Sequence, residues 1–143
     1  TTLNLMEEFY EVVPTEHHVL IDDWMKRVIT YEMGIKTAAY RKLKTDDYEI
    51  SFSIEAQRFE TNEEGIEVKI GMDESVQIGI FSGDPKNLKS ESDILYLKPH
   101  RINKNQMEFK ISVSEIPSYV SIDPYFTRLD RNALNNSKLV SSE

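Results

Sequence analysis

The stretch "YEISFSIEAQRF", residues 48–59, alternates between apolar and polar side chains with a period of two. Its apolar set is Tyr48, Ile50, Phe52, Ile54 and Ala56, and its polar set is Glu49, Ser51, Ser53, Glu55 and Gln57. Successive side chains of a β-strand point to opposite faces of the sheet, so this alternation predicts a strand with one buried face.

The same period recurs along the chain between short polar turns. It is clear at residues 66–72, 76–80 and 107–113, and weaker at 35–43, 94–101 and 119–122. The turns, among them "KTDD", "TNEEG" and "NKNQ", are rich in residues that suit tight backbone geometry. We therefore expect a mainly β fold, an antiparallel immunoglobulin-like β-sandwich of six to seven strands. The loop Ser82 to Asp93 is the longest connection, and we expect it to be the most mobile one.

Helical spacing replaces this alternation near the start of the chain. One apolar set comprises Leu3, Met6, Phe9, Tyr10 and Val13, and a second follows Pro14 and comprises Leu20, Ile21, Trp24, Met25 and Val28. We expect one or two short N-terminal helices, the second capped by Thr15. The chain then divides into a helical lead-in or linker, residues 1–30, and a β-sandwich domain with a polar C-terminal tail, residues 31–143.

The apolar stripe of the lead-in, from Leu3 to Val28, needs a surface to cover. It covers either the sandwich or a neighbouring domain, and Trp24 should be partly exposed if that domain is missing.

Composition excludes several classes of function. With 143 residues and 39% hydrophobic content, the chain suits one domain that buries roughly 68% of its unfolded surface. Its net charge of −8 repels phosphate backbones and anionic lipids, so we expect no nucleic-acid binding. No stretch reaches the ~18 apolar residues of a membrane helix, which predicts a soluble fragment without direct membrane insertion. The first residue is not Met, and we expect a segment of a longer or processed polypeptide.

Catalytic and metal-binding motifs are incomplete. Without cysteine the chain has no disulfide, thiolate zinc site or cysteine nucleophile. His18 and Asp22 are one helical turn apart and provide two metal ligands, but zinc needs three or four and His100 lies in another element. The metalloprotease pairs H-E-x-x-H and H-x-x-E-H, the G-x-S-x-G elbow and the glycine-rich phosphate loops do not occur. We expect no catalytic residue, no metal and no cofactor.

The stretch "SIDPYFTRLDRNALNN", residues 121–136, gathers polar residues after the last predicted strand. It does not fit the spacing of a calcium-binding loop, so we interpret it as a structural tail. Its residues are Asp123, Pro124, Tyr125, Asp130, Arg131 and Asn132.

Each part of the tail has an expected role. Pro124 ends the strand because it lacks an N–H, and Asp123 accepts hydrogen bonds from nearby amides. Arg131 pairs with Asp123 or Asp130. We expect the apolar residues of this segment, Tyr125, Phe126 and Leu129, to dock on the edge of the sandwich.

The segment "IPSYVSIDPYFTRLDRNALNN" resembles the end of large bacterial proteins, common in Bacteroidetes-type genomes, that fuse ABC-transporter permease segments to a gluzincin aminopeptidase domain. Those proteins end in a pattern like "IDPY…(I/L)DRN..DN". The stretches "HHVLIDDWMKRVITYE", "YEISFSIEAQRF" and "LYLKPHRI" are similar to the helical connection and β domain that follow the peptidase. The zinc ligands, general base and transmembrane segments of that family have no counterpart here, and Asn135 stands where the pattern usually has an acid.

Two functions follow from these observations. The resemblance implies a noncatalytic C-terminal accessory domain of a membrane-associated aminopeptidase-like protein, with a structural or substrate-access role. Its partner would be the preceding peptidase-like domain of the same polypeptide, with the parent membrane-anchored and this domain periplasmic. The alternative is an independent β-sandwich module that binds a peptide, glycan or protein through a sheet edge, the 82–93 loop or an exposed aromatic patch.

Overall fold

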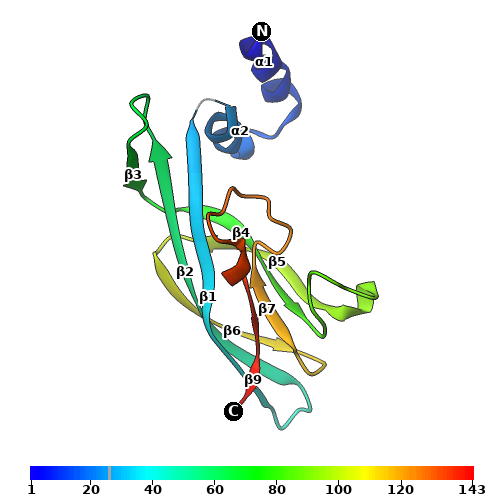
Figure 1. The fold of residues 1–143 in the computed structure, drawn as a ribbon. Coiled ribbons are helices and arrows are strands. Elements are labelled where there is room, and N and C mark those ends of the chain that lie inside the picture. Colours follow the sequence, from blue (N-terminus) through cyan, green and yellow to red (C-terminus); the bar gives the residue numbers. More distant parts are fainter. Residues whose placement is uncertain (26) are drawn as a thin grey trace.

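Two short helices precede nine strands in the computed structural model, which describes residues 1–25 and 27–143, the side chains of Thr2, Asp23 and Trp24 excepted. The helices are α1 (Thr2–Val12) and α2 (His18–Met25). The strands are β1 (Val28–Lys42), β2 (Tyr48–Thr61), β3 (Glu67–Ile70), β4 (Glu74–Phe81), β5 (Ile94–Ile102), β6 (Gln106–Val113), β7 (Tyr119–Ile122), β8 (Ser137–Leu139) and β9 (Ser141–Ser142). The mainly β prediction is thus confirmed (Figure 1).

The first sheet is organised around β1 and β2, which form a long antiparallel hairpin. β2 pairs with β6 along residues 48–55 and with β3 along residues 58–61, so two short strands share one edge of it. On the far side of β1, the chain's last strand, β9, pairs in parallel.

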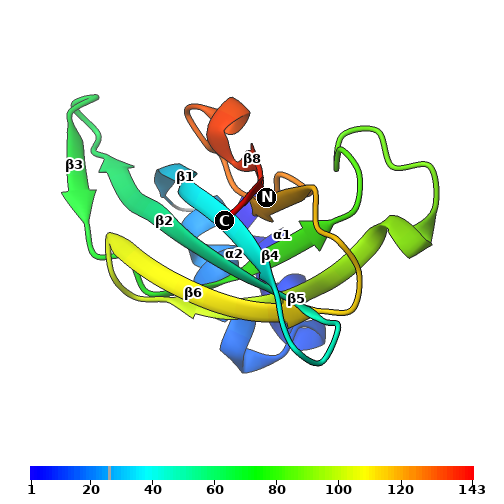
Figure 2. The same cartoon turned by 90° about the horizontal axis from the view of Figure 1, so that it is seen from below.

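The second sheet has the order β5-β4-β7-β8, with each pair antiparallel. This sheet faces the one that contains β1, β2 and β6. The order is that of an immunoglobulin-like sandwich, in which β1, β2 and β6 correspond to strands A, B and E, and β5, β4, β7 and β8 correspond to strands C′, C, F and G. The last strands β8 and β9 belong to different sheets, so the C-terminal segment crosses from one sheet to the other beside β1 (Figure 2).

The core lies between the sheets and is aliphatic. On β2 the buried positions Ile50, Phe52, Ile54 and Ala56 alternate with partly exposed ones, as the opening stretch predicts. The same inward face continues to Arg58, which is also buried. A β-bulge at Lys36 shifts the register of β1 and places Lys36 and its successor on the outside together.

The helical lead-in differs from the expectation in two details. Thr15 is not the N-cap of a helix, because it begins a 3-10 turn, Thr15–His17, that runs directly into α2. The helical segment ends at Met25, and Val28 opens β1 by pairing with Thr61. None of the described helices is both long and apolar enough to cross a bilayer.

The helices form a small hairpin that projects from one end of the sandwich (Figure 1). Met6 and Ile21 are buried between them, and the Tyr10 hydroxyl donates to Asp22 across the pair. α1 packs on α2, and α2 packs on β1. We call this the helical end: α1, α2, the start of β1, β3 and the loop at 123–129.

Candidate functional site

The tail after β7 begins with a turn built by Asp123. This carboxylate is 1% exposed and accepts hydrogen bonds from Thr127 N (3.1 Å), Thr127 Oγ1 (2.6 Å) and Arg128 N (3.0 Å). Its own N–H donates to Gln77 O on β4 (2.8 Å), and Pro124 after it is buried. Asp123 has a φ of +47°, a conformation that aspartate tolerates better than most residues. The backbone of the tail therefore turns sharply away from the sheet.

This turn displays apolar side chains instead of burying them. Tyr125, Phe126 and Leu129 are 51%, 47% and 72% exposed, so the expectation that they dock on the sandwich edge is wrong. Phe126 has a φ of +53°, which is an outlier for a bulky side chain and costs about 1–3 kcal/mol. We call residues 123–129 the display loop, because the hydrogen bonds of Asp123 hold this strained, outward-facing geometry.

Asp130 ties the display loop to β1. Tyr31 N donates to Leu129 O and Arg131 N donates to Tyr31 O, both at 2.9 Å. Asp130 Oδ2 accepts from Met33 N (3.1 Å), and its Oδ1 accepts from the N–H two residues later (2.9 Å). The tail therefore adds a short parallel bridge to the first strand.

A buried asparagine completes this attachment. Asn136 is fully buried, and with its amide nitrogen turned toward the acceptors it donates to Met33 O (2.8 Å) and Asp130 Oδ2 (3.0 Å). Gly34 makes room for the crossing, since a Cβ there would lie 2.9 Å from Asn135 Cγ.

Arg131 binds partners other than the expected ones. Its guanidinium pairs with Glu67 on β3, and its central carbon lies 3.8 Å from the centre of the Phe59 ring. It pairs with neither Asp123 nor Asp130, whose carboxylates bind backbone N–H groups of the tail and of β1 instead. Asp123, Asp130 and Arg131 thus all anchor the tail as expected, but Arg131 attaches the tail to β2 and β3 and not to the two aspartates.

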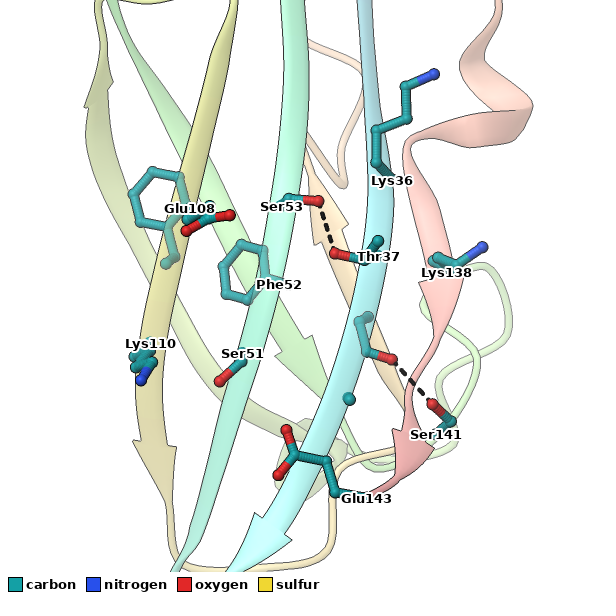
Figure 3. A pocket seen from close by; sticks show the side chains of 13 residues that line it. Lys36, Thr37, Ser51, Phe52, Ser53, Glu108, Lys110, Lys138, Ser141 and Glu143 are labelled. Carbon is teal, nitrogen blue, oxygen red and sulfur yellow. Dashed lines mark hydrogen bonds between the residues drawn. The ribbon is translucent and has the colours of Figure 1, made fainter.

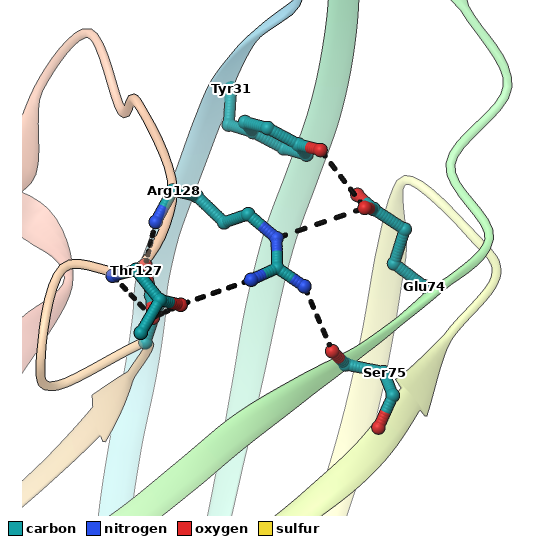
Figure 4. Close-up of polar contacts among 6 residues, drawn as sticks. Tyr31, Glu74, Ser75, Thr127 and Arg128 are labelled. Atoms are coloured by element: carbon teal, nitrogen blue, oxygen red, sulfur yellow. Dashed lines mark hydrogen bonds and ion pairs between the residues drawn. The ribbon is translucent and has the colours of Figure 1, made fainter. Parts of the chain in front are cut away.

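A polar cluster that the sequence did not reveal closes the core beneath the display loop (Figure 4). The side chains of Arg128 and Glu74 are 7% and 9% exposed, with Arg128 Nε 3.7 Å from Glu74 Oε1. Arg128 also donates to Ser75 O (3.2 Å) and to Thr127 Oγ1 (3.0 Å), and Tyr31 OH donates to Glu74 Oε1 (2.9 Å). Burial, followed by the charge of Glu74, raises the pKa of Tyr31, so its hydroxyl stays protonated and acts as a donor.

The polar cluster borders a hollow at the helical end. The hollow has a volume of about 440 Å³ and lies between residues 27–29 at the start of β1, Tyr31 and residues 126–129 of the display loop. Its polar groups are engaged within the protein: the Tyr31 hydroxyl donates to Glu74, and the Arg128 guanidinium donates to Thr127 Oγ1 and Ser75 O.

A second depression lies on the outer face of the first sheet (Figure 3). This outer trough has a volume of about 750 Å³, and its floor includes Thr37 and Ser53, whose hydroxyl oxygens are 2.6 Å apart. Its rim carries charges of both signs, Lys36, Lys110, Lys138, Glu108 and Glu143. Its lining, drawn from the described residues, holds hydroxyl groups without a histidine that would activate them.

The histidines have structural partners. His18 Nε2 lies 2.8 Å from Val13 O, and its ring packs against Tyr10, whose hydroxyl donates to Asp22. His100 on β5 contacts the hydroxyl of Tyr96 at 2.6 Å. Among the described residues, no three or more histidine or acidic side chains gather as metal ligands.

The expected aromatic patch is not formed by Tyr40, Tyr96, Tyr119 and Tyr125, all of which the structure describes. Tyr40, Tyr96 and Tyr119 are partly buried, and only Tyr125 of these four is in the exposed range, at 51%. The 82–93 loop is held locally, with Asp93 accepting hydrogen bonds from Lys89 N, Ser90 N and the Ser82 hydroxyl. Its expected mobility stays a prediction.

Comparisons with family models, curated proteins and solved structures give no match to this chain. Its function therefore has to be inferred from the fold and from the surfaces described above.

Proposed function

We propose that this chain is a noncatalytic C-terminal accessory domain of a membrane-associated aminopeptidase-like protein. Its partner is the preceding peptidase-like domain of the same polypeptide, which the helical end contacts. The parent is membrane-anchored, with this domain on the periplasmic side. The role is structural or controls substrate access, and the chain itself contributes no catalytic residue, metal ligand or cofactor site.

The exposed apolar surface of the helical end is the observation that carries this proposal. Most of the exposed large apolar side chains in the described part belong to it: Leu3, Leu5, Phe9, Val12, Val19, Val28, Val68, Tyr125, Phe126 and Leu129. Exposed apolar patches of this kind mark interaction surfaces. The helices project beyond the sandwich and do not cover its core, which favours a neighbouring domain as the partner (Figure 1).

The rigidity of the display loop supports the same role. Backbone strain persists only where surrounding contacts impose it, and here Asp123 imposes a left-handed Phe126. A protein surface that orders an aromatic residue outward before binding loses less conformational entropy on association. The prediction about Trp24 remains open, since its side chain lies outside the described residues.

The outer trough favours a second candidate function, an independent module that binds an extended peptide or glycan. Its polar floor and mixed charges suit hydrogen bonding to a flexible ligand.

The decisive experiment determines the upstream coding sequence and then measures binding between the encoded domain and this chain. The upstream reading frame should encode H-E-x-x-H, and the encoded peptidase-like domain should bind the purified chain in calorimetry. Phe9→Ser should weaken that binding at least tenfold, whereas Ile116→Ser, a similarly exposed residue in the β6–β7 loop, should leave it unchanged. An upstream frame without that motif, or binding that Phe9→Ser does not affect, would refute the proposal.

A further inference from the structure

The helical lead-in combines an apolar groove with an unusual concentration of negative charge. The groove has a volume of about 360 Å³ and is lined by Phe9, Val13, His17, Leu20, Ile21 and Met25. Residues 1–25 contain six acidic residues and no lysine or arginine, so they supply six of the chain's eight net negative charges. A ligand of the groove would therefore meet both an apolar surface and a negatively charged surrounding.

One groove residue, Phe9, belongs to an exposed apolar stripe on α1 with helical periodicity. Leu5, Phe9 and Val12 of α1 are 46%, 41% and 78% exposed and follow one another at spacings of four and three residues. They form a stripe along one side of the helix, while Met6 on the adjoining side is buried against α2. A second helix laid along this stripe would find apolar contacts on α1 and on the groove floor.

Acidic side chains border this stripe. Glu8 lies three residues after Leu5 and four before Val12, so it is a surface neighbour of both. Glu16 is exposed, and its Oε1 lies 3.6 Å from Nε2 of His17, a groove residue. Cationic side chains of an incoming segment would meet carboxylates on these borders of the groove.

We propose that the groove between α1 and α2 receives an amphipathic helix whose apolar stripe is flanked by lysine or arginine. The distribution of charge selects this occupant. A second copy of this chain would bring six like charges against six, and an anionic membrane surface would repel the same carboxylates. A basic amphipathic helix instead gains Coulomb attraction as its apolar side chains leave water.

This inference rests on the proposed function in one respect: it names the chemistry of the segment that the preceding domain would place against the helical end. Charge complementarity acts mainly on specificity, so its signature is a preference between peptides and a dependence on salt.

Two designed peptides test the charge preference on the full 143-residue chain. Both are about 18 residues long, enough for an isolated helix, with leucines at i, i+3, i+4 and i+7. One carries lysine at the flanking positions and the other carries glutamate. We expect the lysine peptide to bind at least tenfold more tightly in fluorescence anisotropy at low salt, with most of that preference lost in high salt.

Two variants locate the contact. Glu8→Lys should reduce the preference for the lysine peptide severalfold, and Phe9→Ser should weaken the binding of both peptides. Glu115→Lys, a charge reversal in the exposed β6–β7 loop, is the matched control and should change neither.

Equal binding of the two peptides, or no binding of either, would overturn the inference. If the upstream domain binds through Phe9 but the peptides show no charge preference, the inference fails and the proposed function stands. If the lysine peptide binds the groove but the upstream domain does not, the proposed function fails.

Discussion

Replacing Asp123 should destabilise the fold because one buried carboxylate holds the whole display loop. Asp123→Ala removes the acceptor of two backbone N–H groups, those of Thr127 and Arg128, and of the Thr127 hydroxyl. Leaving a donor without its acceptor costs ~1–3 kcal/mol each, less where water reaches it. Alanine is also disfavoured at a φ of +47°, by ~1 kcal/mol. We expect a loss of about 3 kcal/mol in the free energy of unfolding.

Asp123→Asn separates the two contributions. Asparagine tolerates the left-handed backbone and keeps an oxygen for Thr127, but its NH₂ group faces the N–H of Arg128. The expected loss is therefore ~1–2 kcal/mol. Asp46→Ala is the matched control: Asp46 also has a positive φ, +69°, but its side chain is exposed in the β1–β2 turn. It should cost about 1 kcal/mol or less.

Urea denaturation measures these differences, and thermal melting gives a second readout. A change of 1 kcal/mol shifts the melting temperature by ~2–4 °C at this chain length, so Asp123→Ala should melt about 6–12 °C lower. If Asp123→Ala matched the wild type within about 0.5 kcal/mol, the display loop would not depend on this carboxylate.

Three further predictions follow from contacts of the tail, the polar cluster and β5. Arg131→Ala should lower the free energy of unfolding by only ~1 kcal/mol in urea denaturation. It removes a partly exposed ion pair with Glu67 and one contact with the Phe59 ring. A loss above about 3 kcal/mol would contradict this. Tyr31→Phe should cost ~1–2 kcal/mol, because Glu74 loses a donated hydrogen bond, and an unchanged melting curve would contradict it. Burial lowers the pKa of His100, so the unfolded chain takes up a proton first as the pH falls. Stability should therefore decrease as pH drops below about 6.5, and His100→Gln should flatten this dependence.

The central strands could be predicted because each contains its own signal. β2 alternates from Tyr48 to Arg58, and its pairing with β1 and β6 accompanies the burial of the predicted Ile50, Phe52, Ile54 and Ala56. The start of β1 could not be predicted as a strand, since Val28 continues the helical spacing of Ile21 and Met25. Only its long-range pairing with Thr61 makes it a strand.

The final strands gave no local signal either. β8 and β9 are short and largely polar, and they form because β7 and β1 offer partners for their backbone. The structural role of Asp123 was visible in the sequence as a residue that can accept backbone hydrogen bonds beside a proline.

The polar cluster shows a different limit. The buried alternation of β2 extends to Arg58, which marks a charge at the end of the core. Its neighbourhood, with Glu74 from β4 and Arg128 from the tail, is assembled by contacts between distant segments that no local pattern encodes. The exposure of Phe126 and Leu129 likewise depends on the direction of a turn rather than on their hydrophobicity.

Hydrogen exchange, compared between this chain alone and the chain joined to the peptidase-like domain that we propose precedes it, tests most directly whether the helical end is an interface. If it is, amides of residues 3–13 and 125–129 should exchange at least tenfold more slowly when the proposed domain is present, while those at the β5 and β6 edges should not change. Unchanged exchange at the helical end, together with new protection around the outer trough, would contradict it.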